Sequence, residues 1–159
     1  MNLSEILNRD SILHPLHSND CDSVVRELLA HLRRLDFLSG ITKLCSNIVE
    51  VEKKVCSAAG RGIAYPHSTS LEVKELVAVL GISQKGIDYN SPDGQLCHLI
   101  LLTLSPQDEP EVHRRFINRF QYMFKDANLR SKLFDVKDSV EAEYIIQNWE
   151  DEQQEEMEA

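Results

Sequence analysis

One histidine, His67, stands in a stretch whose residues could position an imidazole for nucleophilic chemistry. It follows Pro66 within residues 60–70, which read GRGIAYPHSTS. Pro66 fixes its own φ and pushes Tyr65 toward an extended conformation. A short strand is therefore predicted to end at Tyr65 and to deliver His67 at its mouth, after a turn that the two glycines allow. A neutral imidazole is nucleophilic, and its ordinary pKa leaves a large neutral fraction near pH 7.

The hydroxyls next to His67 could hold a transferred phosphoryl group. In-line attack on phosphorus is mostly a matter of positioning, with the three equatorial oxygens held by donors. Ser68 and Thr69, together with nearby backbone N–H groups, could supply such donors. A histidine after a proline is, taken alone, more often an ordinary loop residue, so a His67 without chemistry is the alternative.

A second histidine, His113, lies in the first turn of a predicted helix. Asp108 is expected to cap that helix, with Glu111 completing a capping box. The dipole and the free N–H groups of a helix N-terminus favour an anion there. The alternative is an exposed histidine beside Arg114 and Arg115.

The rest of the chain is predicted to alternate helices with strands. Buried strands are expected over Val73–Ile82 and Leu96–Leu104, which are rich in aliphatic residues. Between them, Ser83–Gly94 is dense in turn formers and is predicted to be a loop. Helices with one apolar face are predicted at 20–35, 41–55, 108–124, 126–134 and 138–149. The fold class is therefore α/β, a small mixed sheet with helices on both sides.

The composition is that of an ordinary soluble globular protein of 159 residues, 42% hydrophobic and 27% charged. The net charge is −9, but six of the carboxylates lie in residues 150–159. No basic face indicates a nucleic acid as partner. We predict one domain over residues 1–149 and an acidic, disordered tail over residues 150–159. No secretory signal or membrane-spanning stretch is visible, so membrane insertion is not expected.

No pattern of residues predicts a metal or another cofactor. The four cysteines are widely separated and lack zinc or redox spacing, so reduced thiols in the cytoplasm are expected. His14 and His17 have the spacing H-x-x-H, but Pro15 between them argues against the helix that such a metal site would need. These two are expected to be surface histidines.

The stretch around His67 resembles the active-site signature of the IIA proteins of the bacterial phosphotransferase system, fructose/mannitol type. That pattern is glycine, any residue, glycine, apolar, alanine, apolar, proline, histidine. It is matched from Gly60 to His67, with Tyr65 where an aliphatic residue is usual. The loop GIDY…DG at residues 86–94, followed by a long aliphatic strand, resembles the same family. The resemblance implies the α/β fold, phosphorylation of His67, and an assisting role for His113.

One position departs from the family pattern. The family usually has an arginine sixteen residues before the active histidine, and Val51 stands there. Val51 also completes the apolar stripe of its predicted helix, so it is expected to point inward. A bidentate phosphate clamp is then missing. Arg61, Lys53 or Arg114 could compensate, and Ser57, in the place of a family threonine, is a further candidate for binding the phosphoryl group.

The resemblance implies an HPr-like phosphocarrier as donor and leaves three functions open. A transport IIA protein would pass the phosphoryl group to a IIB domain. A regulatory IIA protein would bind target proteins in a way that phosphorylation changes. A degenerate scaffold would keep the fold and lack the chemistry. The lead LSEIL at residues 3–7, the acidic tail and the lack of room for a IIB or IIC domain favour the stand-alone, nitrogen-regulatory branch.

Overall fold

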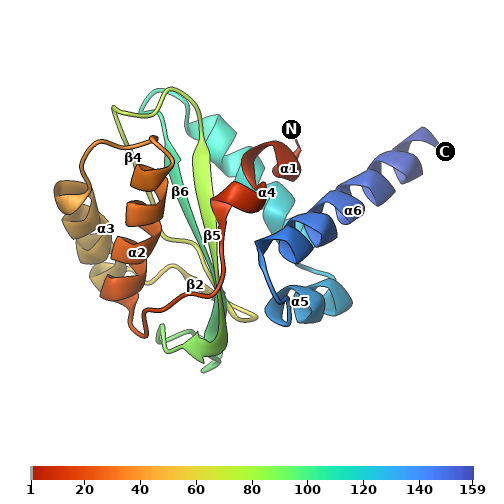
Figure 1. Cartoon of the computed structure of the whole chain (residues 1–159), viewed down its shortest axis with the longest axis horizontal. Helices are drawn as coiled ribbons and strands as arrows, with labels where there is room; N and C mark the ends of the chain where they lie inside the picture. The colour runs from red at the N-terminus through yellow and green to blue at the C-terminus, as the bar shows by residue number, and fades with distance from the viewer. Residues whose placement is uncertain (1) are drawn as a thin grey trace.

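Two long antiparallel strands form the centre of the fold. The computed structural model describes residues 2–159 and contains a six-stranded mixed sheet in the order β1-β5-β6-β3-β2, with β4 also pairing with β6 (Figure 1). The strands are β1 (Ile12–Leu13), β2 (Ala58–Gly60), β3 (Ile63–Ala64), β4 (His67–Thr69), β5 (Val77–Ile87) and β6 (Cys97–Ser105). The helices are α1 (Leu3–Ile6), the 3-10 turn η1 (Arg9–Ser11), α2 (Cys21–Arg34), α3 (Thr42–Lys54), α4 (Pro110–Met123), α5 (Ala127–Phe134) and α6 (Ser139–Glu158).

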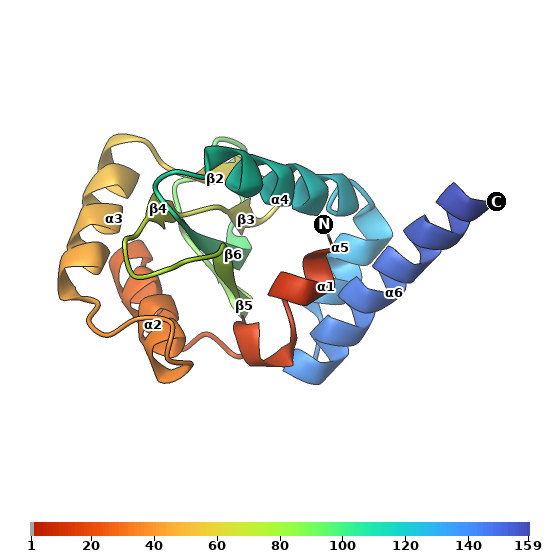
Figure 2. The same ribbon diagram turned by 90° about the horizontal axis from the view of Figure 1, so that it is seen from above.

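Alternation along β6 sends its side chains into two separate cores. Leu99 and Leu101 pack with α1, α4, α5 and α6 on one face, whereas Ile100, Leu102 and Leu104 pack with α2 and α3 on the other. Figures 1 and 2 show these two groups of helices on opposite sides of the sheet. The predicted fold class, a small mixed sheet with helices on both sides, is confirmed.

The strand β5 differs from its predicted bounds at both ends. It begins at Val77 instead of Val73, and it continues to Ile87 through the first part of the predicted loop. The pairing register with β6 shifts between Ile82 and Ile87, and Gly86 has a positive φ of 82°. A bulge therefore absorbs the turn-forming residues, which is a common use of glycine inside a strand.

The prediction that Val51 points inward is wrong, because its side chain is 54% exposed. The row of α3 that faces the core is Ile41, Cys45, Ile48 and Glu52, one position away from the row of valines. The carboxylate of Glu52 is buried because it accepts a hydrogen bond from the Ser57 hydroxyl, at 2.7 Å. Hydrophobicity alone selected Val51 over Glu52 in the last turns of the helix, where a carboxylate with a hydrogen-bond donor can be buried instead.

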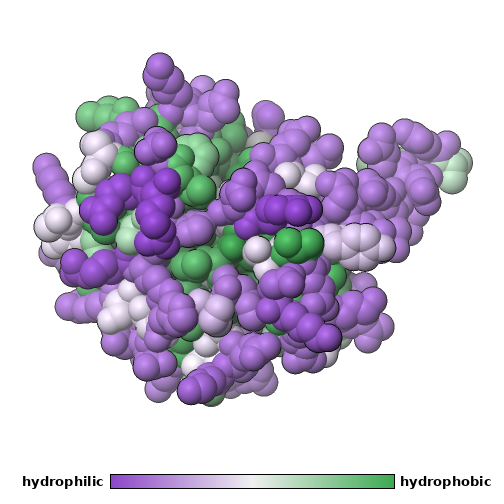
Figure 3. Space-filling model, viewed as in Figure 1, coloured by the Kyte–Doolittle hydropathy of each residue, from purple (hydrophilic) through white to green (hydrophobic). Residues whose placement is uncertain are grey.

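The predicted disorder of residues 150–159 is also wrong, because α6 continues to Glu158. Glu150, assigned to that tail, is 5% exposed and accepts a 2.7 Å hydrogen bond from the backbone N–H of Ser4. It also pairs with Arg119 at 3.1 Å. Glutamate and glutamine are good helix formers, so a helix already docked through Trp149 continues without a cost in propensity. The last turns project from the body (Figures 1 and 2) and are almost entirely hydrophilic (Figure 3).

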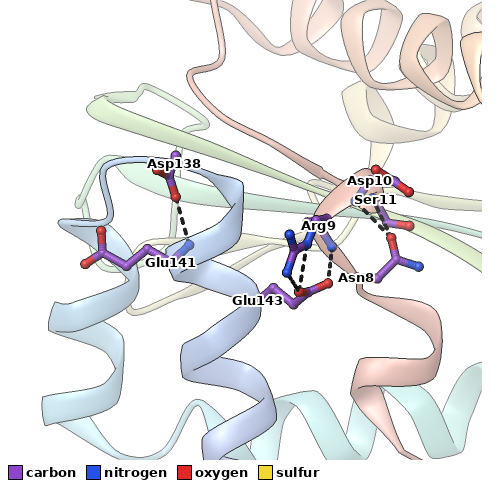
Figure 4. A network of polar contacts seen from close by, with 7 residues as sticks. All are labelled: Asn8, Arg9, Asp10, Ser11, Asp138, Glu141 and Glu143. Atoms are coloured by element: carbon purple, nitrogen blue, oxygen red, sulfur yellow. Dashed lines mark hydrogen bonds and ion pairs between the residues drawn. The ribbon is translucent and has the colours of Figure 1, made fainter.

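Polar contacts attach the N-terminal segment to the first turns of α6 (Figure 4). The Glu143 carboxylate accepts from Nη2 of Arg9 at 2.9 Å and from the backbone N–H of Arg9 at 2.6 Å. Asp138 caps α6 by accepting from the backbone N–H of Glu141 at 2.8 Å. The Glu141 carboxylate in turn accepts from the backbone N–H of Lys137 at 3.0 Å, one residue before the cap.

Candidate phosphoryl-transfer site

The turn before β3 sets the path that leads to His67. Gly60, Arg61 and Gly62 all have positive φ, at 81°, 59° and 83°. A Cβ atom at residue 62 would lie 2.9 Å from Cζ of Phe134, so a side chain there would be both strained and crowded. The chain then runs parallel to β6, with Ile63 opposite Leu99. The expected tight turn at the two glycines is confirmed.

His67 is the first residue of β4 and lies opposite Thr103 of β6. Ile63 and Tyr65 pack into the core beneath α4, and alternation places the His67 side chain on the same face. His67 is exposed, and its Nδ1 lies 3.1 Å from the backbone oxygen of Tyr65. A carbonyl only accepts, so Nδ1 carries the proton of the neutral ring and Nε2 keeps its lone pair. The available nucleophile of His67 is therefore Nε2.

The second predicted histidine lies beside the first. The His113 and His67 rings have their centroids 5.0 Å apart and their planes inclined by 33°. Nε2 of His113 lies 2.8 Å from Oγ1 of Thr103. Partial burial, and secondarily the nearby His67, lower the pKa of His113, which favours its neutral form.

The N-terminus of α4 differs from the prediction in its cap. Glu109 occupies the N-cap position without a side-chain hydrogen bond, and Pro110 begins the helix. The predicted capping box of Asp108 and Glu111 is wrong, because the Glu111 carboxylate instead pairs with Arg114 one turn later. Free N–H groups in the first turn next to His113 make this helix end suited to an anion.

The two hydroxyls that follow His67 lie on different faces of β4. Ser68 is opposite Leu104, whose side chain packs with α2 and α3, so it points away from His67. Its hydroxyl donates to the backbone oxygen of Thr69 at 3.1 Å. Thr69 shares the face of His67 and is exposed. Of this pair, Thr69 is placed on the side of the two histidines and Ser68 is not.

The structure does not bring the other predicted phosphoryl-binding residues to the two imidazoles. The backbone carbonyl of Ser57 accepts a hydrogen bond from the backbone N–H of Tyr65, and the Ser57 hydroxyl donates to the Glu52 carboxylate. Arg61 lies at the tip of the β2–β3 turn, where its backbone N–H donates to Asp93. The partners of residues 63 and 67 are four residues apart on β6, so the Arg61 turn lies more than about 13 Å from His67 along the sheet.

The two remaining candidates to replace the family arginine are engaged elsewhere. Lys53 of α3 lies 3.8 Å from a carboxylate oxygen of Asp22 on α2. Arg114 pairs with Glu111 on the outer surface of α4. Within residues 2–159, neither side chain forms a hydrogen bond with His67.

Sequence reasoning missed Thr103, which lies beneath both histidines. Its side chain is 1% exposed. The signal was present, because Thr103 is a polar residue within the aliphatic run of β6, on the face of Leu99 and Leu101. A buried hydroxyl needs a hydrogen-bond partner, so such a residue marks a polar neighbour across the core.

The other histidines and the cysteines form no metal site within residues 2–159. The part of the chain that the structure describes contains no group of three or more side chains suited to hold a metal ion. None of its helices has the length and apolar character needed to cross a bilayer. All four cysteines are free.

The chain matches the family described as "Phosphoenolpyruvate-dependent sugar phosphotransferase system, EIIA 2" over residues 5–149. It belongs to that family. The resemblance stated from the sequence is thereby confirmed.

Relatives of two kinds are similar to this chain. One is the PTS system fructose-specific EIIABC component of Bacillus subtilis, 25% identical over 86% of this chain, which spans 22% of that relative's length. Another is a nitrogen regulatory protein of Bradyrhizobium diazoefficiens, 24% identical over 84% of this chain and 86% of its own. The crystal structure of nitrogen regulatory protein IIA-Ntr from Neisseria meningitidis has a TM-score of 0.81, with 21% identity over 91% of this chain and 98% of that one.

Proposed function

We propose that the chain accepts a phosphoryl group on Nε2 of His67 from a phosphohistidine carrier of the HPr type. The observation that carries the proposal is the exposed imidazole of His67, held at Nδ1 by a carbonyl and paired with His113 at 5.0 Å. Family membership supports the same reaction class.

The step is determined by the protonation state of His67. The lone pair of Nε2 attacks phosphorus, the bond between phosphorus and the carrier's imidazole nitrogen breaks, and that bond's electron pair returns to the carrier's ring. Attack builds positive charge on the His67 ring. The carbonyl oxygen of Tyr65 accepts a hydrogen bond from Nδ1–H, with 3.1 Å between nitrogen and oxygen, and so stabilises that charge where it develops.

The transferred group carries negative charge and needs donors on the α4 face. The free N–H groups of the first turn of α4, the exposed hydroxyl of Thr69 and the ring of His113 lie on that face. These donors are neutral, and no cation stands at position 51. Transfer in this chain therefore depends on hydrogen bonds more than on an ion pair.

A regulatory role is our first choice for the use of the phosphorylated site. The nitrogen regulatory relative is matched over 86% of its own length, which supports a protein whose contacts change when His67 gains negative charge. The second candidate is donation to a IIB domain in sugar transport, which the fructose-specific EIIABC relative supports. The four free cysteines fit a cytoplasmic location, which we propose for either use.

Phosphate uptake tests the proposal directly. The chain is incubated with radiolabelled phosphoenolpyruvate, enzyme I and an HPr-type carrier, and acid-labile label is measured with time. We expect stoichiometric label on the parent and none on His67→Ala, while His17→Ala, a change at an exposed histidine outside the site, labels like the parent. Equal labelling of His67→Ala and the parent would falsify the proposal, and an unlabelled parent would indicate a scaffold that keeps the fold alone.

The acceptor separates the two uses of the site. Labelled chain is mixed with a purified IIB domain of the fructose/mannitol type, and loss of label from His67 is followed. Transfer within seconds favours transport. Retention of label, together with a protein partner recovered from only one phosphorylation state, favours regulation.

A further inference from the structure

A buried hydroxyl lies under the two imidazoles. Thr103 is 1% exposed and sits in β6 among aliphatic neighbours. Small Ala78 lies opposite it on β5, which leaves space above the strand for a side chain from α4. That side chain is His113, whose Nε2 lies 2.8 Å from Oγ1 of Thr103. Thr103 therefore has a polar partner in an otherwise apolar surrounding.

The direction of this hydrogen bond is decided by the other surroundings of Thr103. Within residues 2–159, Oγ1 of Thr103 has no hydrogen-bond partner besides Nε2 of His113. If His113 donated from Nε2, the proton of the buried hydroxyl would have no acceptor, which is unfavourable. If Thr103 donates, both groups are satisfied. Nε2 of His113 then holds a lone pair, and the proton of the neutral ring is on Nδ1.

The outer nitrogen of His113 is available to a ligand. Nδ1 has no protein hydrogen-bond partner among the described residues, and it is not among their buried polar atoms that lack one, so solvent reaches it. The lowered pKa of His113, caused by burial and then by His67, agrees with a neutral ring. A neutral Nδ1–H donates to an oxygen, whereas a lone pair at the same place would repel one.

We propose that Thr103 is a positioning residue that fixes His113 as its Nδ1–H tautomer and thereby makes this ring a hydrogen-bond donor to the phosphoryl group. The donor step rests on the proposed phosphorylation of His67, whereas the tautomer does not. The two histidines then carry their protons on the same atom for opposite results. At His67 the carbonyl of Tyr65 accepts from Nδ1–H, so Nε2 remains available as a nucleophile. At His113 the Thr103 hydroxyl donates to Nε2, so Nδ1–H remains available as a donor.

The tautomer is measured on the unphosphorylated chain by long-range proton–nitrogen NMR of ¹⁵N-labelled imidazoles at pH 7.5. We expect His113 of the parent to be protonated on Nδ1 alone. Thr103→Val keeps the shape and removes the hydroxyl, so His113 should shift to a mixture with Nε2–H, and Thr103→Ser should restore the parent spectrum. Protonation of Nε2 in the parent, or an unchanged tautomer in Thr103→Val, overturns the proposal.

Labelling from phosphoenolpyruvate through enzyme I and HPr tests the donor step. Thr103→Val should label about tenfold more slowly than the parent, a part of the loss that removing a whole donor causes, and Thr103→Ser should recover the rate. A parent that takes up no label refutes the proposed function but leaves the NMR result standing. A parent that labels, with Thr103→Val labelling equally fast despite a changed tautomer, refutes the donor role alone. If Thr103→Val does not fold, the parent spectrum still decides the tautomer.

Discussion

Each face of the sheet beside β4 buries a polar side chain, but the two buried groups differ in what they leave available for binding. On the α4 face, Thr103 is buried but its partner His113 keeps a nitrogen in contact with solvent, next to exposed His67. On the α3 face, Glu52 is 8% exposed and its carboxylate accepts a hydrogen bond from the Ser57 hydroxyl. The first arrangement leaves a nitrogen of His113 free to bond a ligand, whereas in the second the carboxylate and the hydroxyl bond each other inside the protein.

Strand alternation is the cause of this difference. Adjacent residues of β4 project to opposite faces, so His67 and Ser68 enter different surroundings although they are neighbours in sequence. Chemistry is expected where two elements from distant parts of the chain present incomplete polar groups together, here β4 and α4. The buried Glu52–Ser57 pair on the α3 face is expected to contribute stability. Four predictions test this division, beginning with the largest expected effect.

Replacing His113 with glutamine should slow phosphorylation of His67 by about 10²–10³-fold, because a donor positioned at the transferred group is lost. The initial rate of labelling from phosphoenolpyruvate measures this. His98→Gln is a matched control, since His98 is also half-buried and bonded, at Nδ1 to the oxygen of Ser83, but lies toward the other end of β6. A His113 variant that labels as fast as the His98 variant would remove the α4 face from the reaction.

Replacing Glu52 with alanine should lower the free energy of unfolding by about 1–3 kcal/mol, because the Ser57 hydroxyl loses its acceptor. Urea denaturation measures the change. Labelling of the folded variant should stay within about threefold of the parent, since the Glu52–Ser57 pair faces away from the two imidazoles. Glu50→Ala is the matched control on the same helix, where an exposed pair with Lys54 at 3.8 Å is worth little. Slow labelling with unchanged stability would reverse the roles assigned to the two faces.

Placing an arginine at position 51 tests what the family resemblance says is missing. Val51 is 54% exposed, so Val51→Arg should fold normally and should speed labelling by about two- to fivefold, the range of an exposed ion pair. Val55→Arg, one turn later and 73% exposed, is the matched control and should have no effect. Equal rates in both variants would show that the α3 face does not reach the phosphoryl group even with a long cation.

The sequence predicted the fold and the two histidines because both depend on local patterns. A few consecutive residues are enough to recognise the aliphatic run of β6, the turn before β3 and the apolar stripe of α4. The pairing of His67 with His113 required the family resemblance, since 46 positions separate them. What the residues supplied alone was the chemistry of each ring.

The misassigned residues share a physical reason, which is that a hydrogen-bond partner outside their own helix or strand decided their environment. Glu52 is buried because Ser57 satisfies it, and this moved Val51 to the surface. Glu150 is buried because it accepts from Ser4 near the other end of the chain. Thr103 was overlooked for the same reason, since its partner comes from α4. Burial of a polar group depends on its partner, which periodicity does not report.

The smallest expected effect is a dependence of stability on pH that belongs to the α4 face. The folded pKa of His113 lies below the ordinary value of 6.5, first through burial and then through His67. Below about pH 7 the imidazole binds a proton more readily in the unfolded chain than in the folded one. The free energy of unfolding therefore falls as the pH drops from about 7 through the folded pKa, and His113 does not change it above about pH 7. His113→Gln should flatten this decline between pH 7.5 and 5.5, measured as the urea midpoint at each pH.

The comparison with the parent separates His113 from the carboxylates. Asp93 and Glu143 have lowered pKa values through hydrogen bonds they accept, so their contributions are lost only in more acidic solution, below about pH 4.5. A decline between pH 7.5 and 5.5 that persists unchanged in His113→Gln would mean that another group titrates there. Burial of His113 against Thr103 would then have no energetic consequence. The distinction between the α4 face, where His113 keeps a nitrogen open to solvent, and the α3 face, where Glu52 and Ser57 bond each other, would rest on geometry alone.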